Sequence, residues 1–92
     1  MKKSFVYILT NKYRTVFYTG VTNDLRRRIS EHNNGTGSKF TEKYKTKDLI
    51  YFEEFNDFNQ AVAREKQLKN WKKEWKLNLI KSFNPKLQTL EY

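Results

Sequence analysis

Three titratable side chains fall on the apolar faces of two predicted helices, where a polar group is unusual. In a helical projection of the first helix, Arg28 and His32 lie on the apolar side, one turn apart, so they can act on the same object. In the second helix, Glu65 lies near the centre of the apolar face. A carboxylate there must be paired, hydrogen-bonded or bound to a metal ion, because burying a lone charge costs too much free energy.

Two interpretations of Arg28 and Glu65 stay open at this point. One is a structural ion pair between them that only fixes how the helices pack. The other is a chemical site, since buried ion pairs stabilise proteins poorly and perturbed charged groups cluster at functional sites. His32 has the same two interpretations, as a hydrogen-bonded histidine near a helix end or as part of a site.

The elements that must position these side chains follow from hydrophobic periodicity and helix caps. Strands are predicted over residues 5–9, 16–19 and 49–52, and helices over about 22–33, 58–71 and 73–82, with a polar, basic loop over 36–46. Thr22 or Asn23 is expected to cap the first helix, and Asn56 or Asp57 the second. The short link between the first two strands implies an antiparallel hairpin.

The order ββαβαα predicts an α+β fold, in which a small three-stranded antiparallel sheet is flanked by helices. The length of 92 residues suits a single domain across the whole chain, with its core over about residues 4–84. Pro85 prevents helix formation, and the tail after it is expected to be weakly ordered.

The chain is strongly basic, with a net charge of +9, which points to a polyanionic partner. Nucleic acid is favoured over an anionic membrane, because the basic helices have no apolar side left to face lipid once the core is satisfied. A basic surface that only aids solubility is the alternative. The chain has no cysteine, which excludes disulfides and zinc-thiolate sites and suits a cytoplasmic protein. No apolar run is long enough for a transmembrane helix.

A series of spaced residues extends this picture to most of the chain. In chain order the series comprises Phe5-Val6-Tyr7, Tyr18-Thr19-Gly20, Arg28, His32, Glu65 and Asn84-Pro85. In order and spacing it resembles the GIY-YIG nuclease family, most closely the short stand-alone bacterial members, which are similar to the N-terminal nuclease domain of the bacterial excision-repair excinuclease. The resemblance runs from about Ser4 to Leu87. Phe5, Val6 and Thr19 depart from the name motif, at scaffold positions that vary in the family.

The resemblance implies a three-stranded antiparallel sheet flanked by helices, and an endonuclease that hydrolyses phosphodiester bonds in nucleic acid, with DNA in repair or maintenance as the expected substrate. It assigns the active face to Tyr7, Tyr18, Arg28, His32, Glu65 and Asn84. A single divalent ion, Mg²⁺ or Mn²⁺, would be held by Glu65, and Arg28 would hold the phosphate. Tyr7, Tyr18 or His32 would orient or deprotonate the attacking water, and the choice among the three stays open.

Nothing in the sequence resembles the DNA-targeting domains of many family enzymes, so a nucleic-acid-binding module without useful catalysis is the alternative function. Contacts with nucleic acid are expected from Lys39, Lys66, Lys69, Lys72 and Lys73, and Trp71 and Trp75 are candidates to stack on exposed bases. Each of these residues has a plainer interpretation, as a solvated lysine or a tryptophan of the helix packing. No membrane and no obligate protein partner are expected.

Overall fold

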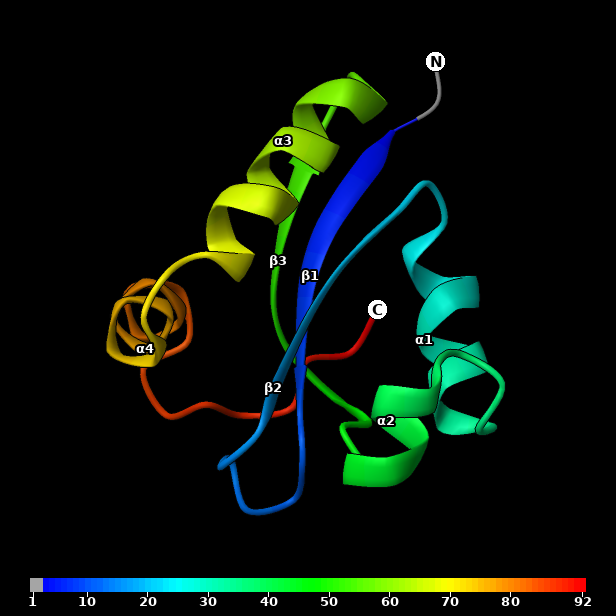
Figure 1. Cartoon of the computed structure of the whole chain (residues 1–92), viewed down its shortest axis with the longest axis vertical. Coiled ribbons are helices and arrows are strands. Elements are labelled where there is room, and N and C mark those ends of the chain that lie inside the picture. Colours follow the sequence, from blue (N-terminus) through cyan, green and yellow to red (C-terminus); the bar gives the residue numbers. More distant parts are fainter. Residues whose placement is uncertain (1–2) are drawn as a thin grey trace.

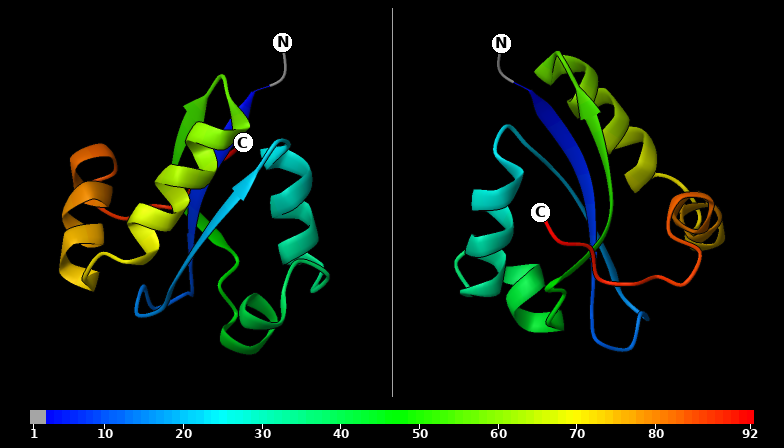
Figure 2. Two further views of the ribbon diagram at one scale, coloured as in Figure 1. Left: turned by 45° about the horizontal axis from the view of Figure 1, so that its top comes forward. Right: turned by 180° about the vertical axis from the view of Figure 1, so that it is seen from behind.

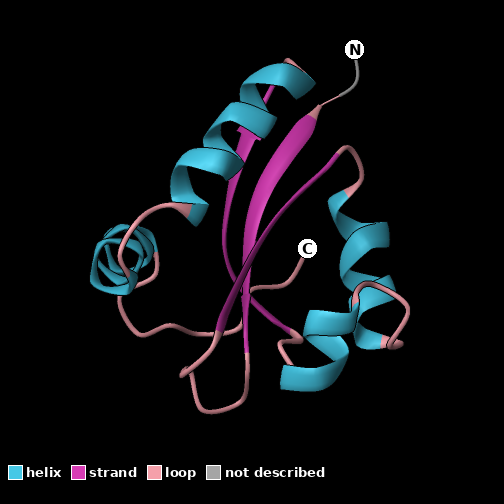
Figure 3. Ribbon diagram, viewed as in Figure 1, coloured by secondary structure: helices cyan, strands magenta, loops and turns pink. Residues whose placement is uncertain are grey.

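The computed structural model describes residues 3–92. In chain order its elements are β1 (Ser4–Thr10), β2 (Phe17–Thr22), α1 (Leu25–Asn33), α2 (Lys39–Tyr44), β3 (Asp48–Phe55), α3 (Phe58–Lys69) and α4 (Lys73–Phe83) (Figure 1). The three strands form one antiparallel sheet in the order β2-β1-β3, with the helices around it (Figure 3). The predicted α+β fold is confirmed. Within the described residues, no helix has the length and apolar composition needed to cross a membrane.

Strand β1 is the centre of the sheet, and all seven of its residues are buried. Its side chains alternate between two core layers, as expected for a strand covered on both faces. Tyr7 and its neighbours on the same face pack with Leu25 of α1, whereas Val6 packs with Ala61 of α3, and Ile8 with Ile80 of α4. The helices α1 and α3 therefore cover opposite faces of the sheet (Figure 2).

The segment predicted as a loop over 36–46 contains a short helix, α2, so this part of the prediction was wrong. Ser38 caps α2, because its side chain accepts a hydrogen bond from the Thr41 main-chain N–H at 3.1 Å. Lys45 ends the helix in the left-handed conformation, with φ 57°. Helix α2 escaped prediction because it has only six residues and its buried contact is the polar side chain of Thr41.

The caps of the longer helices agree with the sequence only in part. Helix α1 is capped by Asp24, whose carboxylate accepts from the Arg27 main-chain N–H at 3.1 Å. The expected caps, Thr22 and Asn23, were therefore wrong. Thr22 instead holds the capping residue in place, because its hydroxyl accepts a hydrogen bond from the Asp24 main-chain N–H at 3.1 Å. For α3, a cap at Asn56 or Asp57 was expected, and the structure has Asp57.

The C-terminal tail, for which weak order was expected, packs along β3. The Asn84 amide donates to the Ile50 carbonyl at 3.0 Å and to the Gln88 carbonyl at 2.7 Å, and it accepts from the Gln88 N–H at 3.1 Å. Further along, the Leu90 N–H donates to the Leu49 carbonyl at 2.7 Å, and the Tyr92 ring meets the sheet edge-on. Such main-chain contacts leave no hydrophobic period in the sequence, which is why they were not predicted.

We expect Asn84→Ala to lower the free energy of unfolding by about 1–3 kcal/mol, because the change leaves the buried Ile50 carbonyl without its donor. Urea denaturation measures this loss, and amide hydrogen exchange should speed up at Leu90. Asn78→Ala is the matched control, since Asn78 is exposed on α4. Equal stabilities of the two variants would contradict the role given to Asn84.

Candidate active site

Tyr7 and Gly20 lie directly opposite each other in the β1–β2 ladder. A Cβ atom added to Gly20 would lie 2.4 Å from the Tyr7 hydroxyl oxygen and equally close to Cζ, well inside van der Waals contact. The hydroxyl end of the phenol ring therefore lies against the main chain of β2 at a position where a side chain would overlap it. This gap lets a buried side chain of the central strand extend its hydroxyl across the edge strand.

His32 of α1 is buried and holds the Tyr7 hydroxyl. The distance from the Tyr7 oxygen to His32 Nε2 is 3.0 Å, and His32 Nδ1 lies 2.9 Å from the Thr41 hydroxyl of α2. Thr41 donates its own proton to the Ser38 carbonyl, at 3.1 Å. Since a hydroxyl has one proton to donate, Thr41 accepts from Nδ1–H, and Nε2 is left to accept the proton of Tyr7.

The charge states in this network follow from burial. Desolvation lowers the pKa of His32 to about 4, and the positive charge of Arg28 acts in the same direction. Burial also raises the pKa of Tyr7 to about 12, although hydrogen bonding to Arg28 works against that rise. At neutral pH the imidazole is therefore neutral and the phenol keeps its proton. The hydroxyl lone pairs of Tyr7 remain able to accept.

Arg28 stands at the open side of the same network. Hydrogen bonding to the Tyr7 hydroxyl raises the pKa of Arg28, and so does its bond to Glu31. The Arg28 guanidinium meets the Glu31 carboxylate at 3.1 Å, between two half-exposed side chains. The permanently charged fork of Arg28 is thus close to Tyr7 and still reachable from solvent.

Tyr18 completes an aromatic group on the same side. Its ring centroid lies 6.3 Å from that of Tyr7 and 5.3 Å from that of His32. Tyr18 is only partly buried, so this ring of the edge strand is the one through which the group meets solvent.

Glu65 approaches from α3, on the opposite face of the sheet. Burial is the largest cause of the raised pKa of Tyr7, and the negative charge of Glu65 adds the smallest contribution. The side chain is 15% exposed and has a loose ion pair with Lys69 at 3.4 Å. Among the ion pairs of residues 3–92, Arg28 pairs with Glu31 and Glu65 with Lys69. The alternative of a structural Arg28–Glu65 pair is therefore not what holds these helices.

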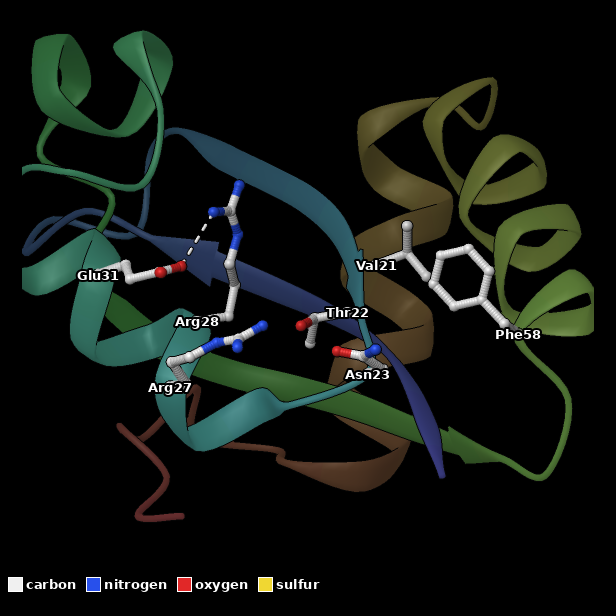
Figure 4. A pocket seen from close by; sticks show the side chains of 7 residues that line it. All are labelled: Val21, Thr22, Asn23, Arg27, Arg28, Glu31 and Phe58. Atoms are coloured by element: carbon white, nitrogen blue, oxygen red, sulfur yellow. Dashed lines mark hydrogen bonds and ion pairs between the residues drawn. The ribbon is translucent and has the colours of Figure 1, made fainter. Parts of the chain in front are cut away.

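A groove of about 370 Å³ straddles the end of β2 and joins the two faces. Its lining comes from β2, the turn after it and both flanking helices, and consists of Val21, Thr22, Asn23, Arg27, Arg28, Glu31 and Phe58. Figure 4 shows Arg27 and Arg28 of α1 on one side of Thr22, with Phe58 on the far side. Since β2 is the edge strand, side chains from both core layers can converge here. Arg27 was not among the predicted site residues, and its exposure on α1 gave no signal for it.

Asn84 is the one predicted site residue that the structure does not bring to this group. Its amide is engaged by the main chain of β3 and of the tail, as described above. Strand β3 lies at the opposite edge of the sheet from β2, with β1 between them. In this structure the Asn84 amide anchors the C-terminal tail to β3, and its predicted role in the site stays a prediction.

The five lysines predicted to contact nucleic acid differ in their exposure and in their partners. Lys39 and Lys66 are exposed, and Lys69 is the partner of Glu65. Lys72 lies over the Trp75 ring at 5.7 Å. Lys73 donates to the Thr15 carbonyl at 2.6 Å and lies over the Phe17 ring, which ties α4 to the β1–β2 hairpin.

Thr41 and Gly37 are two neighbours of the predicted site residue His32 that sequence reasoning did not identify. Thr41 orients the His32 ring, and a Cβ at Gly37 would lie 2.3 Å from His32 Nδ1. The capping pattern Ser38-x-x-Thr41 was the available signal for a helix at this place, but nothing in it points to His32.

No group of three or more metal-ligating side chains gathers within residues 3–92. A single-carboxylate site needs no such cluster, since Mg²⁺ keeps most of its waters and takes few protein ligands. Glu65 fits that role, because its carboxylate is partly exposed and only loosely paired.

Comparison with known proteins agrees with this geometry. Residues 3–78 match the GIY-YIG catalytic domain, a nuclease domain, and the chain therefore belongs to the GIY-YIG family. The resemblance predicted from the spaced tyrosines is confirmed.

The relatives within that family are short proteins of similar length. A UPF0213 protein from Clostridium perfringens is 41% identical over 88 residues, which are 96% of this chain and 94% of the relative. A UPF0213 protein from Staphylococcus saprophyticus is 38% identical, over 87% of this chain and 96% of the relative. The solution NMR structure of a UPF0213 protein from Bacillus halodurans shares 32% identity and a TM-score of 0.54, and covers 85% of this chain and 82% of that one. The prediction of the short stand-alone type is confirmed.

We expect Gly20→Ala to lower the free energy of unfolding by about 1–3 kcal/mol, because the new methyl group overlaps the Tyr7 ring. In a Tyr7→Leu background the same change should cost much less, since the overlapping atoms are gone. Urea denaturation of the four proteins in this cycle measures the difference. Gly35→Ala, where no atom lies within 4 Å but φ is +78°, controls for backbone strain alone. The same cost for Gly20→Ala in both backgrounds would contradict the contact.

We expect His32, the only histidine, to stay neutral down to about pH 4, as followed by NMR of its ring. Its folded pKa lies below the ordinary value of 6.5, so between these limits the unfolded chain binds a proton that the folded chain does not. Stability should therefore fall as pH falls from about 6.5 to 4, by at most about 1.4 kcal/mol per pH unit. His32→Gln should remove this slope. A ring titration midpoint near 6.5 would contradict the burial of His32.

Proposed function

We propose that this chain is a divalent-metal-dependent endonuclease that hydrolyses phosphodiester bonds in nucleic acid, with DNA in repair or maintenance as its substrate. The observation that carries the proposal is the environment of the Tyr7 hydroxyl. This hydroxyl bonds to His32 and Arg28, and the negative charge of Glu65 adds to the rise in its pKa. These groups come from a central strand and from helices on opposite faces of the sheet. Packing alone does not require them to meet.

The protein ligand of the divalent ion is Glu65, whose partner Lys69 is a half-exposed side chain that can turn away into solvent. When bound, Mg²⁺ or Mn²⁺ supplies charge neutralisation on the phosphate and stabilises the departing oxygen. Glu65 contributes a fixed negative charge, which would hold the cation.

Arg28 binds the non-bridging oxygens of the scissile phosphate. Its planar fork suits two oxygens of one phosphate, and its charge does not depend on pH in the physiological range. Glu31, which holds Arg28 in the free protein at 3.1 Å, is half-exposed and can rotate into solvent when the phosphate arrives. Arg27 lines the same groove and can contact the neighbouring phosphate.

Tyr7 is the residue that receives the proton of the attacking water. Its own proton points to His32 Nε2 at 3.0 Å, so the oxygen lone pairs face away from the histidine. To deprotonate the water, Tyr7 must first lose its own proton to solvent, a loss that the neighbouring Arg28 favours and that a bound divalent ion would favour further. The phenolate would then accept the proton of the water and become a neutral phenol again, while His32, whose pKa is lowered to about 4, stays neutral.

A nucleic-acid-binding module without useful catalysis is the second candidate function. It is favoured by the net charge of +9 and by the lysines on α2, α3 and α4, which attract a polyanion whether or not the site turns over. The two functions differ in one observable, since only the nuclease predicts strand breaks that need a divalent ion.

We expect Glu65→Gln to lower metal-dependent plasmid nicking by at least about 100-fold, because the amide keeps the shape of the side chain but removes the charge that holds the ion. Binding to the same DNA, measured in EDTA, should change little. Nicking assays in Mg²⁺ and in Mn²⁺ measure the effect.

Glu74→Gln, an exposed carboxylate of α4, is the matched control and should nick like the parent protein. Undiminished nicking by Glu65→Gln would disprove the metal assignment. Intact binding without nicking by the parent protein, across DNA and RNA substrates, would favour the binding module.

A further inference from the structure

Two large aromatic side chains are exposed on the short helix α2. Phe40 is 37% exposed and Tyr44 is 41% exposed, and their ring centroids lie 4.7 Å apart. They form one continuous aromatic surface, which we term the α2 platform (Phe40 and Tyr44). Single exposed apolar residues are common, but a contiguous pair beside a site marks a surface that contacts something.

The α2 platform continues into the candidate active site. The Phe40 ring lies 5.5 Å from that of Tyr18, and Tyr18 in turn lies 5.3 Å from His32. An aromatic row thus leads from the buried histidine, through the edge-strand tyrosine, to solvent at Tyr44.

Helix α2 is fixed relative to the site rather than loosely attached. Thr41, between the two platform residues in sequence, is fully buried and hydrogen-bonded to His32. Ser38 caps the helix and also bonds the Thr41 hydroxyl at 3.1 Å. The same contacts that orient His32 therefore hold the α2 platform at a constant distance from the reacting group.

The charge around the α2 platform is suited to a polyanion. Residues 36–47 contain four lysines and a single acid, Glu42. Lys43 lies over the Tyr44 ring at 5.2 Å, and Lys39 begins the helix beside Phe40. These lysines also disfavour a second copy of this chain on the platform, since each copy carries a net charge of +9.

We propose that the α2 platform stacks the unpaired bases of the nucleic-acid strand next to the scissile phosphate, with Lys39 and Lys43 on its backbone. Aromatic rings bind bases by their faces, which are free in a single strand and covered by neighbouring base pairs inside a duplex. The preferred substrate is therefore nucleic acid with unpaired nucleotides beside the cut. This inference rests on the proposed function only for the place of the cut, and base stacking can be measured without cleavage.

The test measures binding in a Glu65→Gln background without divalent ions, by anisotropy of a labelled oligonucleotide. The oligonucleotide is offered as a single strand, as a blunt duplex and as a single strand with abasic sites. Tyr44→Leu and Phe40→Leu should each weaken single-strand binding by about 10-fold, which corresponds to about 1.4 kcal/mol, and leave duplex binding within about 2-fold. Abasic sites should weaken binding by the parent and have little effect on the variants.

Tyr13→Leu is the matched control. Tyr13 is 75% exposed on the β1–β2 hairpin and also carries a lysine, Lys12, over its ring. The Tyr13→Leu variant should bind the single strand and the duplex with the same affinity as the parent. Tyr44 contacts Phe40 rather than the site tyrosine, so Tyr44→Leu keeps the test valid even if Phe40→Leu disturbs Tyr18.

Several outcomes would overturn the inference. Equal losses of affinity for single strand and duplex would show a general electrostatic or folding effect. Unchanged single-strand binding by Tyr44→Leu would show that the α2 platform does not stack bases. A platform that mediates self-association instead would appear as a dimer of the parent that Tyr44→Leu dissociates in sedimentation. If nicking fails while the single-strand preference depends on Tyr44, the proposed function fails and the inference stands.

Discussion

The ring of Tyr7 lying against the main chain of Gly20 is the contact on which the site depends. Tyr7 belongs to the central strand, so its backbone is fixed by both core layers at once. Its hydroxyl can reach the helices only by crossing β2, and it crosses where a side chain is missing. A buried strand thus sets the position of the group that meets Arg28 and His32, and no mobile loop carries the central hydroxyl.

The edge position of β2 explains how residues from opposite faces of a sheet can share one site. In the interior of a sheet, Arg28 and Glu65 would be separated by the backbone and both core layers. At β2 the sheet ends, and the groove there is lined by residues of both α1 and α3. Arg64 and Arg14 have structural partners in Glu53 and Asp48, whereas Arg27 and Arg28 line the groove, where a phosphate can reach them.

Much of this arrangement was available from the sequence, and the remainder depends on contacts between distant segments. Hydrophobic periodicity located the strands and showed Arg28, His32 and Glu65 on inward faces. It could do so because residues three or four positions apart lie on the same side of a helix, and this spacing is visible in the sequence. The partner of Arg28, the anchor of His32 in Thr41 and the structural use of Asn84 could not be predicted in this way. Each depends on hydrogen bonds of polar groups, whose geometry leaves no repeating pattern.

The C-terminal tail determines how much aromatic surface the sheet exposes to other molecules. Leu90 packs on the same core layer as Tyr7, and the Tyr92 ring covers Phe5 and Phe52. Without these contacts no group of the site would be lost, but aromatic rings on the sheet would be uncovered and the layer that supports the phenol would lose packing. Exposed aromatic surface of this kind promotes association between chains, so Leu90 and Tyr92 shield the sheet from neighbouring molecules.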